Sequence, residues 1–388
     1  MLFARRFGLF AFAILISLSS ALSSARANPM LLVDMETLDV LYAQEAGQPW
    51  HPASLTKMMT AYVAFEEIAK GTITLDTPVV LSKHAIAQAP SKSGLPVGSA
   101  LSMKDALYVM LVKSANDVAV AIAETVAGSE PKFVVKMNDV ASRMGMTASH
   151  FTNANGLHDA AQVVTARDMA LLALYIRQSF PQYMPIFGTE VVMLGKAQLE
   201  SQNELLTKFA GTTGMKTGFV CASGLNTVTT VERNGRQMLA VVLGGSSARE
   251  RNERAAELVL KGLSGSATPT GQTILTLGNQ VGAPPVDMRL NICGKGAVEY
   301  VKAQEAAFPM GLKGQPSYLN DVVVPNSYVA TNLGKVAAGV NLPRPRPNNH
   351  IPLYPTPVAD ASVSGDLRPG LAVAGSTSMP IPKPRPNL

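Results

Sequence analysis

The stretch Ser54-Leu55-Thr56-Lys57 sets a hydroxyl and an amine one turn apart at the start of a predicted long helix. Apolar residues recur at three-to-four spacing from Leu55 onward, until Gly71 ends the helix. Because side chains at i and i+3 share one face of a helix, Ser54 and Lys57 are expected to be neighbours near its N-terminus. The stretch therefore predicts a serine nucleophile with a lysine as its base.

Two further short signatures follow along the chain, Ser114-Ala115-Asn116 and Lys216-Thr217-Gly218. With the first stretch they stand in the order, and at roughly the intervals, of the S-x-x-K, S-x-N and K-T-G set of penicillin-recognising serine hydrolases. Any one of these strings occurs by chance in many chains of this length, whereas the ordered triple is specific. The chain is therefore predicted to be an acyl-transferring serine hydrolase.

The three signatures supply the groups that acyl transfer needs. Lys57 must be neutral part of the time to accept the serine proton, and burial beside a second cation, Lys216, would lower its pKa. Ser114 can relay a proton between the lysines and the leaving group. Asn116 can hold the acyl-side amide of a substrate, since its side chain both donates and accepts hydrogen bonds.

The attacked carbonyl needs donors for the negative charge that develops on its oxygen. The backbone N–H groups of Ser54 and Phe219 are the candidate donors, and the N-terminus of the helix favours the same charge. The scheme needs no histidine, metal or organic cofactor. Four histidines show no metal-ligand spacing and are expected to be structural or surface residues: His51, His84, His150 and His158.

Over residues 28–262 the chain resembles the serine D-alanyl-D-alanine carboxypeptidases, which are low-molecular-mass penicillin-binding proteins. Residues 151–157, 165–168 and 214–219 support the resemblance alongside the three signatures. It implies an α/β (α+β) fold of the β-lactamase/DD-peptidase type, in which helices flank an antiparallel sheet and an all-helical subdomain is inserted.

By the same resemblance, Ser54 is acylated by the penultimate D-alanine carbonyl of a peptidoglycan stem peptide, and β-lactam antibiotics bind the same site. Terminal D-alanine then leaves and water deacylates the enzyme. Lys216, Thr217, Gly218 and Phe219 are expected to bind substrate. An arginine on the last helix is expected to grip the terminal carboxylate; Arg251 is preferred and Arg249 is the alternative.

Two rival activities share these signatures. A serine β-lactamase needs a glutamate that activates the deacylating water, and residues 153–161, where that base is expected, contain none. A peptidoglycan D,D-endopeptidase would cut cross-linked dimers in preference to monomeric pentapeptides. A non-catalytic wall-binding protein fits poorly, because the nucleophile and both lysines are intact.

The ends of the chain differ in composition from its body. Arg5, Arg6, an apolar run over 7–22 and the small-x-small site at 25–27 indicate an export signal, so the protein is expected in the periplasm or cell envelope, soluble or only peripherally membrane-associated. The predicted divisions are 1–27 as signal peptide, 28–263 as catalytic domain, 264–341 as linker and weakly defined extension, and 342–388 as a proline-rich, basic, disordered tail.

The formal net charge of +6 lies in these two ends. Residues 1–27 hold three arginines and no acid, and the segment after Leu342 holds five cations against two acids. The body is therefore neutral, which argues against nucleic acid as a partner. The basic tail is instead predicted to tether the protein to an anionic wall polymer or to a protein partner.

Local patterns predict the remaining elements. The chain has two cysteines, and a Cys221–Cys293 disulfide would staple a late segment to the edge of the site, although two unrelated buried thiols are the alternative. Gly262 is expected to end the last helix. The predicted elements are strands or hairpins at 30–42, 190–194 and 225–243, and helices at 102–111, 117–127, 131–144, 169–177 and 249–261. Ser102 and Thr165 are expected to cap helix starts, Gly128 to end the helix at 117–127, and Asn234-Gly235 to form the turn of the last hairpin. Strands at both ends of the domain, with helices between them, predict one sheet built from the two ends.

Overall fold

Strands from both ends of the catalytic region form one antiparallel sheet, as the sequence predicted. The computed structural model describes residues 28–336, so the predicted signal peptide and proline-rich tail lie outside the described residues. The sheet runs in the order β2-β1-β9-β8-β7. Its strands are β1 (Met30–Asp34), β2 (Val40–Gln44), β7 (Thr212–Val220), β8 (Gly224–Arg233) and β9 (Arg236–Gly245).

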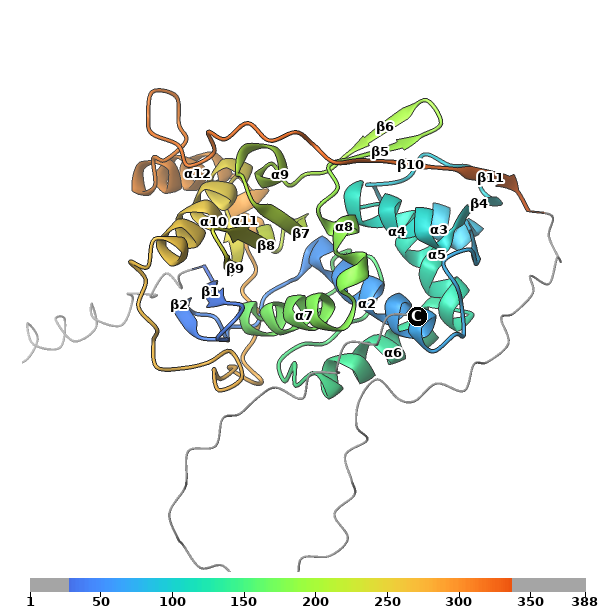
Figure 1. Cartoon of the computed structure of the whole chain (residues 1–388), viewed down its shortest axis with the longest axis horizontal. Coiled ribbons are helices and arrows are strands. Elements are labelled where there is room, and N and C mark those ends of the chain that lie inside the picture. Colours follow the sequence, from blue (N-terminus) through green and yellow to red (C-terminus); the bar gives the residue numbers. More distant parts are fainter. Residues whose placement is uncertain (1–27, 337–388) are drawn as a thin grey trace, which may run out of the picture.

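Both faces of this sheet are buried by helices (Figure 1). Alternate residues of β1 serve the two faces: Leu31 and Val33 join the core beneath α7 (Ala166–Ser179), whereas Leu32 joins the core beneath α10 (Ala248–Leu263). Side chains alternate along a strand, so an unbroken apolar run is what a sheet covered on both sides requires.

A mostly helical part is inserted between β2 and β7. Helix α2 (Thr56–Ala69) lies at its centre and is buried along nearly its whole length, so its methionines are core. Predicted caps are present: Ser102 caps α4 (Met103–Val112), and Gly128 ends α5 (Asn116–Ala127) in the left-handed conformation. The other helices here are η1 (Ala53–Leu55), α3 (Lys83–Ile86), α6 (Glu130–Arg143), η2 (Pro181–Tyr183), α8 (Met184–Phe187) and α9 (Leu205–Lys208).

The inserted part is not all-helical. It also carries β3 (Pro78–Val80), β4 (Ser99–Ser102), β5 (Val191–Leu194) and β6 (Ala197–Glu200), which pair as two antiparallel ladders. Strands β3 and β4 are too short, at three and four residues, to give an alternating pattern in the sequence.

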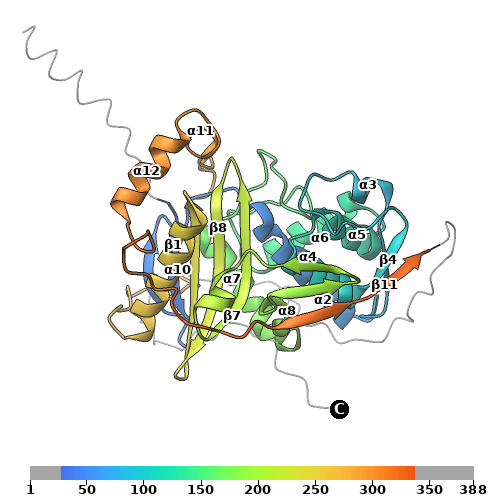
Figure 2. The ribbon, with the colours of Figure 1, turned by 90° about the horizontal axis from the view of Figure 1, so that it is seen from above.

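The segment after α10 has more regular structure than the sequence indicated. It contains α11 (Arg289–Ile292), α12 (Ala297–Ala307), β10 (Ser327–Ala330) and β11 (Asn332–Lys335). We call residues 309–336 the C-terminal strap. It crosses from the α10 side to the helical part, where β10 adds parallel to β5 and β11 adds antiparallel to β4 (Figures 1 and 2).

The prediction that Gly262 ends the last helix is wrong, because α10 continues through it to Leu263. A Cβ at Gly262 would lie 2.6 Å from the sulfur of Met238 and 3.3 Å from Leu32. The glycine therefore lets the helix approach the sheet, and the left-handed residue comes later, at Gly265. Among the described residues, no helix is both long and apolar enough to cross a membrane.

Candidate active site

The turn that carries Ser54 is wedged between two glycines. A Cβ on Gly218, in β7, would lie 2.9 Å from the Ser54 nitrogen and 3.0 Å from the Pro52 oxygen. Gly156 has φ +88°, and a Cβ there would collide with the carbonyl of Ala53. Ala53 itself has φ +49°, a strained value for a residue with a side chain. The surrounding packing thus fixes the serine in place.

Lys57 lies beside the serine in a buried environment. Its Nζ is 3.0 Å from Ser54 Oγ, 2.6 Å from Asn116 Oδ1 and 2.5 Å from the Asn155 carbonyl oxygen, and the side chain is fully buried. Burial, then the charge of Lys216, hold the Lys57 pKa well below its ordinary value, with Asp117 opposing them. A neutral amine can donate to the two fixed acceptors and accept from the serine hydroxyl.

Asn116 holds Lys57 and the facing loop together. Its Nδ2 donates to the Ala89 carbonyl at 2.9 Å, while its Oδ1 accepts from Lys57. Both ends of this side chain are therefore engaged within the protein, so the expected contact with a substrate amide would share one of these bonds. Ser114, two residues earlier, has φ +61° and lines the cleft.

The third signature lies on β7, on the other side of the serine. Lys216 is buried, and its Nζ donates to the Thr217 carbonyl at 3.0 Å. Burial, together with the nearby Arg251 cation, lowers the Lys216 pKa to about 7. The structure thus brings the residues of all three signatures together around one cleft, whose volume is about 660 Å³.

Of the arginines considered on α10, Arg251 reaches this cleft. Its Nε donates to Asn252 Oδ1 at 2.9 Å and its Nη2 to the Gln202 carbonyl at 3.1 Å, and burial lowers its pKa to about 10. Arg249 turns away, since it donates to the carbonyls of Phe308 and Met310. The sequence of α10 could not show which arginine faces the cleft, because the residues that contact each arginine belong to other segments of the chain.

Sequence reasoning missed several residues of the cleft. The Asn155 carbonyl is a main-chain group, so no residue type in the sequence indicates its role. Lys113 adjoins the second signature, and Glu204 lies in a segment with no motif. The half-exposed Phe219 was expected. The residues lining the cleft are Ser54, Pro90, Ser91, Lys113, Ser114, Asn116, Gly156, Leu157, Ser201, Gln202, Glu204, Thr217, Gly218, Phe219, Val220, Leu225, Ala248 and Arg251.

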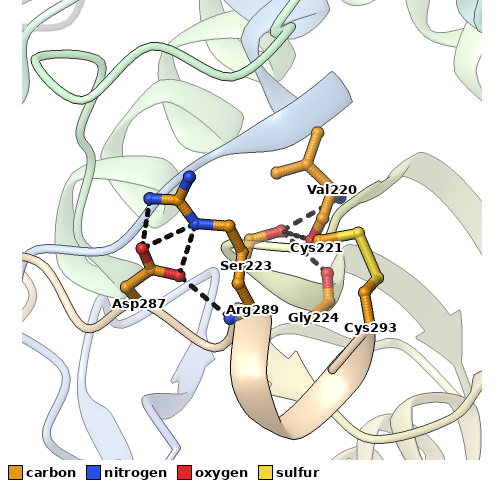
Figure 3. The surroundings of a disulfide bond; sticks show 7 residues. All are labelled: Val220, Cys221, Ser223, Gly224, Asp287, Arg289 and Cys293. Atoms are coloured by element: carbon orange, nitrogen blue, oxygen red, sulfur yellow. Dashed lines mark hydrogen bonds and ion pairs between the residues drawn. A yellow bond between two sulfur atoms is a disulfide. The ribbon is translucent and has the colours of Figure 1, made fainter. Parts of the chain in front are cut away.

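A disulfide anchors the segment around α11 to the end of β7. Cys221 and Cys293 are joined with their Cα atoms 5.7 Å apart (Figure 3). The Met288 N–H donates to the Ala222 carbonyl at 3.0 Å, which adds a backbone tie at the same place. Neither cysteine lines the cleft, but Val220, which precedes Cys221, does.

Comparison with known proteins gives a consistent result. A family model described as D-alanyl-D-alanine carboxypeptidase, Peptidase_S11, matches residues 17–247. The chain is 31% identical to D-alanyl-D-alanine carboxypeptidase DacD of Salmonella typhimurium, over 66% of this chain and 67% of the relative. It is 30% identical to DacF of Bacillus subtilis, over 60% of this chain and 61% of the relative.

Solved structures are similar over the same region. Penicillin binding protein 5 from Haemophilus influenzae superposes with a TM-score of 0.59 at 30% identity, over 62% of this chain and 71% of that one. Penicillin-binding protein D2 from Listeria monocytogenes, in its cefotaxime-bound form, superposes with a TM-score of 0.54 at 29% identity, over 61% of this chain and 97% of that one.

Proposed function

This chain belongs to the D-alanyl-D-alanine carboxypeptidase family of serine peptidases, and from that premise we propose that it removes the terminal D-alanine of peptidoglycan stem pentapeptides through an acyl-enzyme on Ser54. The observation that carries the proposal is the Lys57 Nζ, fully buried and 3.0 Å from the Ser54 hydroxyl. A deprotonated amine at that distance is the base that a serine nucleophile requires.

Acylation proceeds by transfer of one proton and formation of one bond. Neutral Lys57 takes the proton of Ser54 as Oγ attacks the carbonyl carbon of the penultimate D-alanine. Backbone N–H groups of Ser54 and Phe219 are the proposed donors to the resulting oxyanion. The C–N bond then breaks, and Ser114 passes the proton from the ammonium to the leaving nitrogen, so D-alanine departs and Lys57 is neutral again.

Deacylation repeats these steps with water. The water gives a proton to Lys57 as its oxygen attacks the ester carbon, and the proton returns to Ser54 Oγ when the ester bond breaks. Hydrolysis therefore uses the same protein groups as acylation. Both reactions depend on the depressed pKa of Lys57, which burial and Lys216 provide.

Selection of a free C-terminus is assigned to the β7 side of the cleft. Thr217 offers a hydroxyl there, and the Arg251 guanidinium offers a fork of donors suited to a carboxylate. The buried Lys216 adds positive charge near Arg251 when it is protonated, and its pKa is about 7. A D,D-endopeptidase would place a longer peptide where the terminal carboxylate is expected, so the buried arginine favours the carboxypeptidase.

β-Lactams are proposed to acylate the same serine. The Listeria relative is described bound to cefotaxime and to ampicillin, and the two lysines and two serines of the triple here offer the same chemistry. Export to the cell envelope, with the tail as a tether, is also proposed, from the composition of the two ends of the chain. Deletion of residues 342–388 should then shift the protein out of the wall-associated fraction.

The proposal is tested by replacing the nucleophile. Ser54→Ala should abolish both D-alanine release from a pentapeptide and covalent labelling by a fluorescent penicillin. Ser142→Ala, at an exposed position on α6, is the matched control and should keep both. Mass mapping of the labelled peptide identifies the acylated residue. Labelling retained by a folded Ser54→Ala variant would refute the assignment.

A further inference from the structure

Lys113 stands in the cleft wall immediately before Ser114. It follows the last turn of α4, and its backbone is fixed: its N–H donates to the Val109 carbonyl at 3.2 Å, and its carbonyl accepts from Ser91 Oγ at 3.0 Å. The residue is partly exposed and lines the cleft. Within residues 28–336 its ammonium group forms no hydrogen bond or ion pair, so it is available to a ligand.

The other charged groups that line the cleft are already engaged. Glu204 pairs with Lys208 at 3.1 Å, and Arg251 donates to Gln202 and Asn252. Lys57 and Lys216 are buried around the serine. The charged residues that line the cleft are thus two cations, Lys113 and Arg251, against one acid, Glu204, and Lys113 is the one without a protein partner among the described residues.

Lys113 and Arg251 come to the cleft from different helices. Helix α4, which leads into Lys113, and helix α10, which carries Arg251, lie on opposite sides of β7 in both views (Figures 1 and 2). In the proposed reaction Arg251 holds the carboxylate of the departing D-alanine. The part of the substrate that precedes the attacked carbonyl must then leave Ser54 in the other direction, toward the loop that Lys113 begins.

We propose that Lys113 is a specificity-determining residue that binds a carboxylate on the acyl side of the substrate. The preferred substrate is then a doubly anionic peptide, with one carboxylate at its C-terminus and another on a residue before the two D-alanines. This inference rests on the proposed carboxypeptidase function. It adds a second anion-binding point, which favours peptides whose two charges are correctly spaced.

The test uses two synthetic peptides that end in D-alanyl-D-alanine. In one, the residue before the two D-alanines carries a side-chain carboxylate; in the other, the same residue carries the carboxamide. The wild type should show a kcat/KM roughly tenfold higher for the carboxylate peptide, which is the size expected of a partly exposed charge-assisted hydrogen bond. The preference should weaken as salt is added.

Variants test whether Lys113 causes the preference for the carboxylate peptide. Lys113→Gln should bring the ratio of the two kcat/KM values close to one, and Lys113→Arg should restore it. Lys132→Gln, an exposed charge change on α6, is the matched control and should leave the ratio as in the wild type. A ratio that Lys113→Gln does not change, or a wild type without preference, overturns the inference. Failure of the wild type to release D-alanine from either peptide would instead refute the proposed function.

Discussion

Gly218→Ala tests whether position 218 must be glycine because β7 packs closely against the turn that carries Ser54. The added Cβ would lie 2.9 Å from the Ser54 nitrogen, 3.0 Å from the Pro52 oxygen and 3.1 Å from the Leu55 nitrogen. All three contacts are backbone atoms, so no flexible side chain can move aside. Strand β7 and the turn before α2 must separate instead.

The size of the effect follows from these distances. Ordinary contact begins near 3.4 Å, so the strand and the turn must separate by about half an ångström. Displacement of reacting groups by 1 Å costs about 100-fold in rate, so half of that should slow acylation about tenfold. Overpacking costs about 1–3 kcal/mol of unfolding free energy, and the stiffer unfolded chain of alanine offsets about 0.5 kcal/mol of it.

The assay measures the second-order rate of acylation by a fluorescent penicillin and the thermal unfolding midpoint. Gly296→Ala is the control, because a Cβ there meets no heavy atom within 4 Å. The expected result is slower acylation and a lower midpoint for Gly218→Ala alone. Equal acylation rates in the two variants would refute the argument that this glycine positions the serine.

Three further outcomes are expected. Loss of the disulfide in Cys221→Ala/Cys293→Ala should lower the free energy of unfolding by about 4 kcal/mol, given the 72-residue separation, while penicillin labelling of the folded variant persists; an unchanged denaturant midpoint would contradict this. Tyr328 stacks on Tyr108 with ring centroids 3.6 Å apart and donates to Asp105 at 2.8 Å. Tyr328→Ala should therefore destabilise by about 2 kcal/mol and Tyr328→Phe by about 1 kcal/mol in denaturant unfolding, and equal losses would rule out a role for the stack. Burial and Arg251 lower the Lys216 pKa from 10.5 to about 7 in the folded protein. Between these pH values the unfolded chain therefore binds more protons at this site than the folded chain does, so the contribution of Lys216 to the free energy of unfolding rises with pH. Lys216→Met should therefore stabilise most below pH 7, with a gain that shrinks toward pH 10; melts showing a constant gain from pH 6 to 9.5 would argue against it.

Elements specified by nearby residues could be predicted from the sequence. Capping is a contact over three residues, so Ser102 and Thr165 were found as helix starts, and Asn234-Gly235 marked the turn between β8 and β9. The pairing of the first and last strands followed from their positions at the two ends of one domain. Ser54 and Lys57 could be placed together because a helix has a fixed period.

The strap could not be predicted, because its stability comes from distant partners. Strand β10 has four residues, and it pairs with β5, which lies well over a hundred residues earlier. Helix α12, which precedes the strap, was missed because it has no side-chain cap and no buried residue, so neither a cap nor an apolar stripe marks it. The helix end predicted at Gly262 was wrong for a related reason, because the role of this glycine depends on a distant strand. A glycine that ends a helix and one that lets a helix approach a sheet look alike in a sequence.

Deacylation separates this cleft from that of a serine β-lactamase. Within residues 153–161 the group that reaches Lys57 is the Asn155 carbonyl, which accepts a hydrogen bond but cannot take a proton from water near neutral pH. Glu130 does contact this loop, but one of its oxygens accepts from the Ala154 N–H at 3.0 Å and the other lies 2.9 Å from His84. Water must then be activated by Lys57 and approach from the side that the leaving group vacates. D-alanine diffuses away and opens that path, whereas the amine released from a β-lactam stays tethered to the acyl group. We therefore expect rapid turnover of peptides and a long-lived penicilloyl-enzyme from the same set of residues.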